Sequence, residues 1–200
     1  VNAEAVEYLA GLAKESGTFL LQLSTDFIFN GRNGPYHEDD TPDPVSKYGI
    51  TKLEAEKIII SSQIKYAIVR TILVYGFSIT SPRHNLVTWV IESLKAGKKI
   101  RVVSDQFRTP TLAEDVATGC SLIIQKKIDG IFHIGGIDTL SPYQMAVKIA
   151  KYFNLDESLI ENVLTVDLPQ QGKRPTRTGL IIDKARKILG YEPCSFEKGL

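Results

Sequence analysis

Residues 23–56, which read LSTDFIFNGRNGPYHEDDTPDPVSKYGITKLEAE, decide the fold of this 200-residue chain. The stretch begins where a buried strand predicted at 18–24 would end, crosses a loop rich in glycine and proline, and enters a helix that Ser46 would cap. On that helix, Tyr48 and Lys52 are four residues apart and therefore share one face, about one turn apart. A hydroxyl at the strand end, facing this phenol and ammonium, suits proton delivery to a carbonyl oxygen.

The sequence on either side of this stretch alternates between strand and helix patterns. Apolar residues at helical spacing predict a first helix that ends near Lys14, with Gly17 just past its end. Further strands are predicted at 66–76, 100–103 and 130–134, and further helices at 46–62, 86–96, 112–125, 142–153 and 183–189. Strands that alternate with helices predict a mainly parallel α/β sheet.

The composition is that of an ordinary globular protein, with 43% hydrophobic residues, 24% charged residues and a net charge of +1. This balance gives no electrostatic reason to expect a nucleic acid or a membrane as partner. Cys120 and Cys194 are far apart, which suggests a reducing compartment and no cysteine-rich metal site. The apolar runs are shorter than a membrane span. We therefore expect a cytoplasmic protein without a bound metal.

Tyr48 and Lys52 are the first candidates for chemistry. A free phenol ionises at about pH 10, and a nearby ammonium or a cationic nicotinamide ring favours its phenolate form. Such a phenol can give a proton to an oxygen while hydride reaches the adjacent carbon. The pair by itself also fits a surface tyrosine beside a solvated lysine, so its meaning depends on the surrounding motifs.

Those motifs resemble the extended short-chain dehydrogenase/reductases and, among them, most closely the dTDP-4-dehydrorhamnose reductases. The resemblance begins with S-T-D at 24–26 and Y-G-x-x-K at 48–52, in the order of strand, loop and helix that the family shows. It continues through V-R-T-x-x-V-Y-G at 69–76. The remaining matching stretches are 35–38, 105–111, 114–117, 130–133 and 174–175.

The resemblance implies an α/β fold, with a Rossmann-like, doubly wound parallel sheet whose N-terminal units are missing and a smaller α/β substrate-binding lobe. Residues 1–75 and 112–134 would form the C-terminal part of the NAD(P)-binding Rossmann domain. Residues 76–111 and 135–200 would form the substrate-binding lobe. The site would lie between the lobes, at the carboxyl ends of the strands.

The resemblance also implies roles for individual residues. Thr25 would bind the keto oxygen, Tyr48 would donate the proton, and Lys52 would hold the nicotinamide ribose. The cofactor would be NADPH or NADH, and the residues in contact with it would be Ser24, Tyr48, Lys52 and Thr71. The substrate would be a nucleotide sugar, a dTDP-6-deoxyhexose reduced at its 4-keto group, and its ligands would be Thr25, Asp26, Phe27, Asn85, Gln106 and Arg174.

Several of these residues also have simpler interpretations. Thr25 and Asp26 could form a local turn at the strand end. Asn85 stands before a predicted helix, where its side chain could serve as the N-cap. Arg70 ends an apolar strand and is predicted to form a structural ion pair, because a buried charge needs a partner. His133, in another apolar strand, is predicted to be a core residue.

Two loops add further candidates for the pocket. Arg108 and Thr109 belong, with Gln106, to a loop that would line the nucleotide-sugar pocket. Lys173, Arg174 and Arg177 form a basic cluster that could bind a diphosphate or could be a solvated loop.

The sequence departs from the family at three points. It contains no Gly-x-x-Gly-x-x-Gly turn for the cofactor pyrophosphate, so we expect the chain to begin after the first β–α units. Phe27 stands where tyrosine is usual. Leu73 stands where bacterial rhamnose-pathway reductases commonly carry tryptophan, which implies a different substrate pocket.

Two alternatives stay open at this point. The chain also resembles the regulatory β subunit of methionine adenosyltransferase, which binds a nicotinamide cofactor and partners a catalytic subunit. A sugar-nucleotide epimerase is the third interpretation. The family resemblance makes a homodimer the expected assembly.

Overall fold

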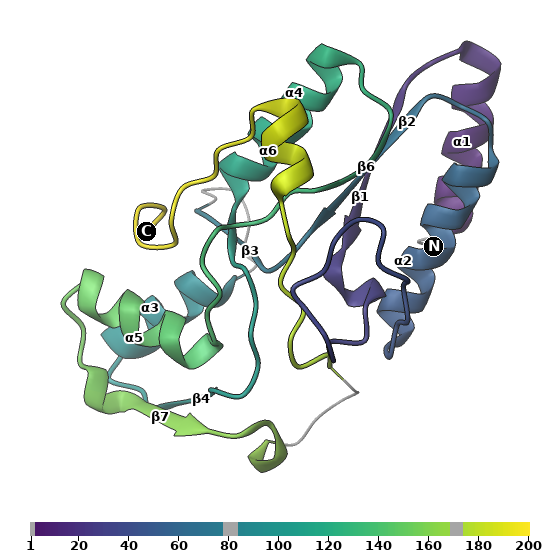
Figure 1. Cartoon of the computed structure of the whole chain (residues 1–200). Coiled ribbons are helices and arrows are strands. Elements are labelled where there is room, and N and C mark those ends of the chain that lie inside the picture. The colour runs from purple at the N-terminus through teal and green to yellow at the C-terminus, as the bar shows by residue number, and fades with distance from the viewer. Residues whose placement is uncertain (1–2, 78–83, 169–173) are drawn as a thin grey trace.

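Three parallel strands form the sheet that carries the predicted site (Figure 1). The computed structural model describes residues 3–77, 84–168 and 174–200. Within them, β1 (Leu20–Thr25), β2 (Tyr66–Thr71) and β6 (Gly130–His133) lie in the order β1-β2-β6. Thr25 pairs with Thr71 at one edge of this sheet. The strand ends that hold the candidate residues therefore meet at the same edge.

Helices cover both faces of this sheet. The helices α1 (Glu4–Ser16) and α2 (Lys47–Ser61) pack together on one side, and α4 (Ala113–Lys126) and α6 (Asp183–Leu189) pack together on the other (Figure 1). Strand β2 explains this arrangement, because its side chains alternate between two apolar clusters. Ile68 packs with Val6, Ala55 and Ile59 from α1 and α2. Ala67 and Val69 pack with residues of α4 and α6, including Ile123, Ala185 and Leu189.

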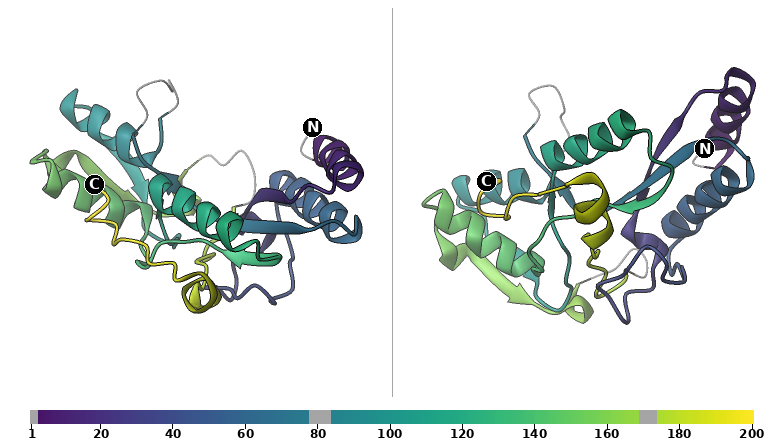
Figure 2. Two further views of the ribbon diagram at one scale, coloured as in Figure 1. Left: turned by 90° about the horizontal axis from the view of Figure 1, so that it is seen from above. Right: turned by 45° about the horizontal axis from the view of Figure 1, so that its top comes forward.

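A second group of elements lies at the opposite end of the molecule from α1 and α2 (Figure 2). It consists of α3 (Leu86–Lys95), α5 (Pro142–Tyr152) and the parallel strands β4 (Ile100–Val103) and β7 (Ile160–Val163). Asn85 and Ser141 cap the two helices through reciprocal side-chain and backbone hydrogen bonds. Val90, Met145 and Ile149, all fully buried, belong to their shared core. The short strands β3 (Val74–Tyr75) and β5 (Thr111–Leu112) pair with each other.

The fold class predicted from the sequence, an α/β fold with parallel strands, is confirmed. The predicted strand 66–76 is instead two strands, because Leu73 has a φ of 39° that interrupts the extended backbone. Strand β7 was not predicted. Its two inner residues, Glu161 and Asn162, are exposed, so the sequence lacks the alternation that marks a half-buried strand. No helix in the described ranges is long and apolar enough to span a bilayer.

The predicted division into lobes, 1–75 with 112–134 against 76–111 with 135–200, remains a prediction. The packing of α6 concerns the assignment of residues 135–200 to the second lobe. Helix α6 and the following Tyr191 share their core with β2, β6 and α4 rather than with α3 and α5. The chain therefore returns to the first sheet near its C-terminal end.

Gly49 lets α2 approach the end of β1. A Cβ at this position would collide with the carbonyl oxygen of Phe27 and would contact Pro44. Gly49→Ala should therefore cost about 1–3 kcal/mol, the usual effect of overpacking. The matched control is Gly11→Ala in α1, which meets nothing within 4 Å and should stabilise the protein by about 0.5–1 kcal/mol through helix propensity. Urea unfolding measures both variants, and equal stability of the two would contradict the close approach.

Candidate functional site

A cleft of about 630 Å³ lies at the edge where β1 ends. Seven of the residues predicted from the sequence line it, namely Thr25, Asp26, Phe27, Tyr48, Gln106, Arg108 and Arg174. The remaining lining residues are Ile72, Leu73, Leu86, Trp89, Arg101, Val102, Val103, Pro142, Thr165 and Leu168. The cleft is thus formed jointly by the first sheet and by the second group of elements.

Thr25 lies at the last position of β1, where the chain turns into a short 3₁₀ helix, Asp26–Ile28. Its hydroxyl oxygen accepts a hydrogen bond from the backbone N–H of Phe27 at 3.2 Å. The same hydroxyl donates to Oδ1 of Asp26, also at 3.2 Å. Thr25 therefore forms the local turn that the sequence suggested, and its side chain also lines the cleft.

Asp26 is almost completely buried, with 3% of its surface exposed. Its Oδ2 accepts a hydrogen bond from the hydroxyl of Thr178 at 2.5 Å. Burial raises the pKa of Asp26 to about 6, although hydrogen bonds from Thr178 and Thr25 and the positive charge of Arg108 act in the opposite direction. Asp26 can therefore change its charge near neutral pH.

Tyr48 lies in the first turn of α2, and Ser46 caps this helix by accepting a hydrogen bond from the Gly49 N–H. Tyr48 is 48% exposed. It contacts the ring of Phe27 edge to face, with centroids 6.0 Å apart. Lys52, one turn later, reaches back to β1 and donates to the carbonyl oxygen of Leu23 at 3.2 Å. The helix therefore brings the phenol to the cleft and the ammonium to the strand beside it.

Five predicted residues, namely Ser24, Lys52, Thr71, Asn85 and Thr109, are not among those that line the cleft, and their roles remain predictions. Thr109 is buried, and its hydroxyl oxygen accepts a hydrogen bond from the backbone N–H of Leu180. Lys52 is described above. Ser24 donates to Glu56 at 2.5 Å inside the protein. Asn85 uses its side chain to cap α3 and to bind the carbonyl oxygen of Gly76. Thr71, at the end of β2, has a buried hydroxyl oxygen with no hydrogen-bond partner among the described residues.

A network of buried polar side chains connects α2, β2 and β6 next to the site. Arg70 donates to Glu56 at 2.8 Å, and the two side chains are 3% and 1% exposed. The structural ion pair predicted for Arg70 is confirmed. Arg70 also binds the backbone carbonyl oxygen of Glu38, whose carboxylate accepts a hydrogen bond from the backbone N–H of His133.

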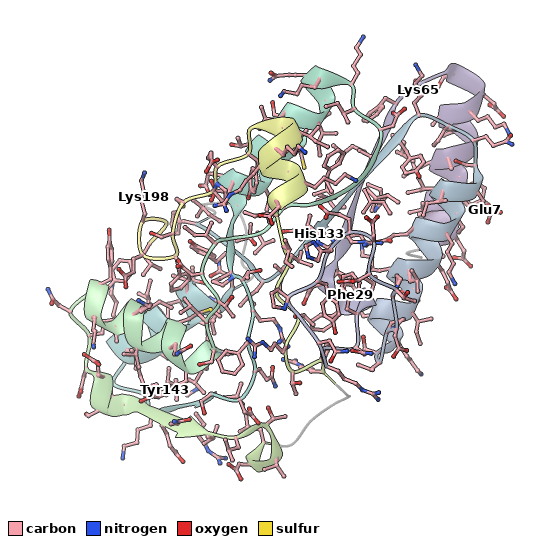
Figure 3. The ribbon with its side chains drawn as sticks, in the orientation of Figure 1. Glu7, Phe29, Lys65, His133, Tyr143 and Lys198 are labelled. Atoms are coloured by element: carbon pink, nitrogen blue, oxygen red, sulfur yellow. The ribbon has the colours of Figure 1, made fainter. Side chains whose placement is uncertain are left out.

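His133 is fully buried, which confirms its prediction as a core residue. Figure 3 shows it in the interior beside Phe29, and the two rings meet edge to face. Burial, together with the charge of Arg70, lowers the pKa of His133 to about 3. The imidazole is therefore neutral at physiological pH and serves packing and hydrogen bonding rather than charge.

Arginine side chains dominate the charge of the cleft. Arg101, Arg108 and Arg174 line it, from β4, from the loop before β5 and from the segment before α6. The guanidinium of Arg108 is held by the backbone carbonyl oxygens of Phe107, Thr176 and Pro175. The guanidinium groups of Arg101 and Arg174 suit a phosphate-containing ligand, because a guanidinium can donate to two phosphate oxygens at once.

The predicted basic cluster is only partly assembled here. Arg174 lines the cleft, whereas Arg177 lies over the ring of Phe107 and is not among the lining residues. Lys173 falls outside the described residues. Among the described residues, no group of three or more His, Cys, Asp and Glu side chains is arranged to hold a metal ion.

Sequence reasoning missed Arg101 and Trp89. Arg101 is an exposed residue of the strand I-R-V-V, a position where charge is expected without any function. Trp89, the only tryptophan of the chain, was a signal that could have been used, because a partly exposed tryptophan on an amphipathic helix often marks a binding surface.

Comparisons with known proteins show the family of the chain. A family model described as the RmlD substrate binding domain matches residues 1–200. Methionine adenosyltransferase 2 subunit beta of Bos taurus is 33% identical over 196 residues, which cover 95% of this chain and 58% of that protein. The probable low-salt glycan biosynthesis reductase Agl14 of Haloferax volcanii is 30% identical over 202 residues, covering 100% of this chain and 67% of that protein.

Solved structures give the same picture of the fold. A dTDP-4-dehydrorhamnose reductase of Clostridium acetobutylicum is 32% identical with a TM-score of 0.92, and the match covers 100% of this chain and 69% of that one. A dTDP-4-dehydrorhamnose reductase of Bacillus anthracis in complex with NADP has the same TM-score and coverage at 27% identity. The chain spans 58% of the length of the methionine adenosyltransferase subunit that it matches.

Proposed function

The chain belongs to the RmlD substrate binding domain family, and from this premise we propose that the whole protein is an NAD(P)H-dependent reductase. Its substrate would be the 4-keto group of a dTDP-6-deoxyhexose, and its product dTDP-L-rhamnose. We further propose a cytoplasmic homodimer. The observation that carries the proposal is the convergence of Thr25 and Tyr48 on one cleft at the carboxyl edge of a parallel sheet.

The residues around this edge fit a nicotinamide cofactor. Thr71 has a buried hydroxyl oxygen with no hydrogen-bond partner among the described residues, as expected where a ligand completes the site. The ammonium of Lys52 lies at the adjacent strand end, held by the carbonyl oxygen of Leu23. Lys52 and Thr71 would hold the nicotinamide end, together with Ser24. When bound, the cofactor supplies the hydride.

The protein's own residues would bind the substrate and give a proton to its keto oxygen. The Thr25 hydroxyl would hold the keto oxygen, and the Tyr48 hydroxyl would give its proton to that oxygen. The ammonium of Lys52, one turn from Tyr48, would favour the phenolate left behind. Arg101 and Arg174, which also line the cleft, suit the diphosphate of a nucleotide sugar.

The proposal is tested by following NAD(P)H absorbance with the whole protein and a dTDP-4-keto-6-deoxyhexose, and by identifying the sugar that is formed. We expect one cofactor to be oxidised for each sugar reduced. Return of a sugar of opposite configuration without net cofactor oxidation would instead indicate an epimerase.

A second candidate function follows from the relatives. The similarity to methionine adenosyltransferase 2 subunit beta supports a regulatory subunit that binds NAD(P) and associates with a methionine adenosyltransferase. This candidate requires the cofactor to bind but no sugar to be reduced. Association with a purified methionine adenosyltransferase, together with absence of turnover, would favour it over the reductase.

A further inference from the structure

Within the described part of the chain, Trp89 is the one aromatic side chain that the second group of elements contributes to the cleft. We propose that its indole is the stacking surface for the base of a pyrimidine nucleoside diphosphate sugar. Trp89 would thus be a specificity-determining residue, which makes the cleft prefer nucleotide sugars to sugars without a base. The choice of a dTDP sugar rests on the proposed function, whereas nucleotide binding at Trp89 can be tested without sugar or turnover.

Helix α3 does not need Trp89 for its core. Val87, Val90 and Leu94 are buried in the core that α3 shares with α5, whereas Trp89 is 36% exposed and is not part of that core. The indole makes no ring contact, cation–π contact or hydrogen bond with other described residues. A tryptophan usually buries its ring and pairs its N–H. The ring and the N–H of Trp89 are therefore available to a ligand.

The surroundings of Trp89 form an apolar wall of the cleft. Leu86 lies one turn before Trp89 in α3, and both side chains line the cleft. A nucleobase suits such a wall, because every base has a flat π-face that can stack on an aromatic ring. The other members of the wall come from β4, from the first turn of α5 and from the residue after the 3₁₀ helix Thr165–Asp167, and they are Val102, Val103, Pro142 and Leu168.

The chemistry of the cleft divides in the same way as that of a nucleotide sugar. In the proposed function, Thr25 and Tyr48 bind the sugar, and Arg101 and Arg174 bind the diphosphate. The apolar wall is the part of the cleft that these groups leave over, and the base is the part of the ligand that they leave over. The cleft of about 630 Å³ also lies in the range of roughly 300–1,000 Å³ that small-molecule sites occupy.

The sugar ring is the alternative occupant of the indole face. It is placed elsewhere by its chemistry, because the keto oxygen has to lie within hydrogen-bond reach of Tyr48 to receive a proton. Tyr48 comes from α2, whereas Trp89 comes from α3 in the second group of elements, which lies at the opposite end of the molecule (Figure 2). In a nucleotide sugar the diphosphate separates the base from the sugar. The base is therefore the part that reaches the wall around Trp89.

Tryptophan fluorescence tests the stacking directly, without sugar or reduced cofactor. Trp89 is the only tryptophan of these 200 residues, and a base stacked on an indole quenches its emission. We expect dTDP to quench the fluorescence of the whole protein in a saturable manner. Inorganic pyrophosphate, which has no base, should cause no quenching. The signal is assigned to Trp89 by its loss in Trp89→Phe.

Calorimetry with the same two probes measures how much the indole contributes. Trp89→Leu keeps an apolar side chain but removes the flat ring, so the Kd for dTDP should rise by about 5–100-fold, the usual effect of losing one base stack. Trp89→Phe should restore part of the affinity. The Kd for pyrophosphate should stay unchanged in both variants, which damage to the whole cleft would not allow.

The control for these variants is Tyr8→Leu. Tyr8 is an aromatic residue of α1 that is 77% exposed and does not line the cleft. Its replacement removes a ring of similar exposure from a surface that the proposed ligand does not reach. Both Kd values should therefore equal those of the wild type.

Steady-state kinetics separate base binding from a role in the reaction. The base is remote from the reacting carbon, so its contact with Trp89 is the same before and in the transition state. Trp89→Leu should therefore raise the KM for the keto sugar by about the factor found for dTDP and leave kcat almost unchanged. A large fall in kcat would instead place the sugar against Trp89 and overturn the proposal.

The stacking surface and the reductase fail in different ways. Quenching by dTDP that depends on Trp89, together with absence of turnover, would reject the reductase and keep the stacking surface. Turnover with wild-type affinity for dTDP in Trp89→Leu would keep the reductase and overturn the stacking surface. Fluorescence that changes with protein concentration but not with dTDP would also overturn it, and would indicate that a second copy of the chain covers Trp89.

Discussion

Replacing Tyr48 with phenylalanine is expected to lower the turnover of the whole protein by about 10²–10⁴-fold, the usual contribution of a positioned proton donor. Phenylalanine keeps the ring that packs edge to face on Phe27 and removes only the hydroxyl. Because the tyrosine is about half exposed, the fold should be little affected. Steady-state kinetics measure the loss, which should lie in kcat, with cofactor binding retained.

The matched control for this variant is Tyr152→Phe. Tyr152 is also partly exposed, but it lies at the end of α5, outside the cleft. It should leave turnover at the wild-type level. If Tyr48→Phe also retained near-wild-type turnover, Tyr48 would not be the proton donor, and the reductase chemistry proposed for the cleft would have to be abandoned.

Replacing Glu56 with alanine should destabilise the protein by about 3–5 kcal/mol. Glu56 and Arg70 are almost fully buried, and the carboxylate also accepts a hydrogen bond from Ser24. Removal of the carboxylate leaves a buried guanidinium without its counter-charge, which costs far more than the lost contact itself. Urea unfolding of the wild type and variant measures the difference.

A surface pair provides the comparison for Glu56. Glu157 forms an exposed ion pair with Lys151, so Glu157→Ala should change the free energy of unfolding by only about 0–1 kcal/mol. Similar stability of Glu56→Ala and Glu157→Ala would contradict the buried pair.

The local parts of the site were predictable from sequence because they depend on neighbouring residues. Helical spacing alone placed Tyr48 and Lys52 on one face, and the charge of Arg70 in an apolar strand required a partner. The parallel direction of the strands was predictable from the alternation of strands and helices, since parallel strands need crossover connections that are usually helical. Glycine, serine and asparagine at helix ends marked the helix boundaries to within one or two residues.

The rest of the site depends on contacts between distant parts of the chain. Asp26 and Thr178 are 152 residues apart, and no spacing rule connects them. For that reason, the sequence alone did not decide whether Asp26 forms a turn or binds the sugar. Arg101 and Trp89 join the cleft because α3 and β4 fold back towards β1. Leu73 adopts a positive φ that its own side chain does not favour, so the break between β2 and β3 is imposed by its surroundings.

The account is tested most directly by following deuterium into the sugar from a reduced nicotinamide cofactor that carries deuterium at both C4 positions. The whole protein, given this cofactor and a dTDP-4-keto-6-deoxyhexose, should release a reduced sugar with deuterium at C4, and Tyr48→Phe should form it at least about a hundredfold more slowly. A protein that binds the cofactor but releases no labelled sugar would contradict the reductase and leave the regulatory subunit as the better description.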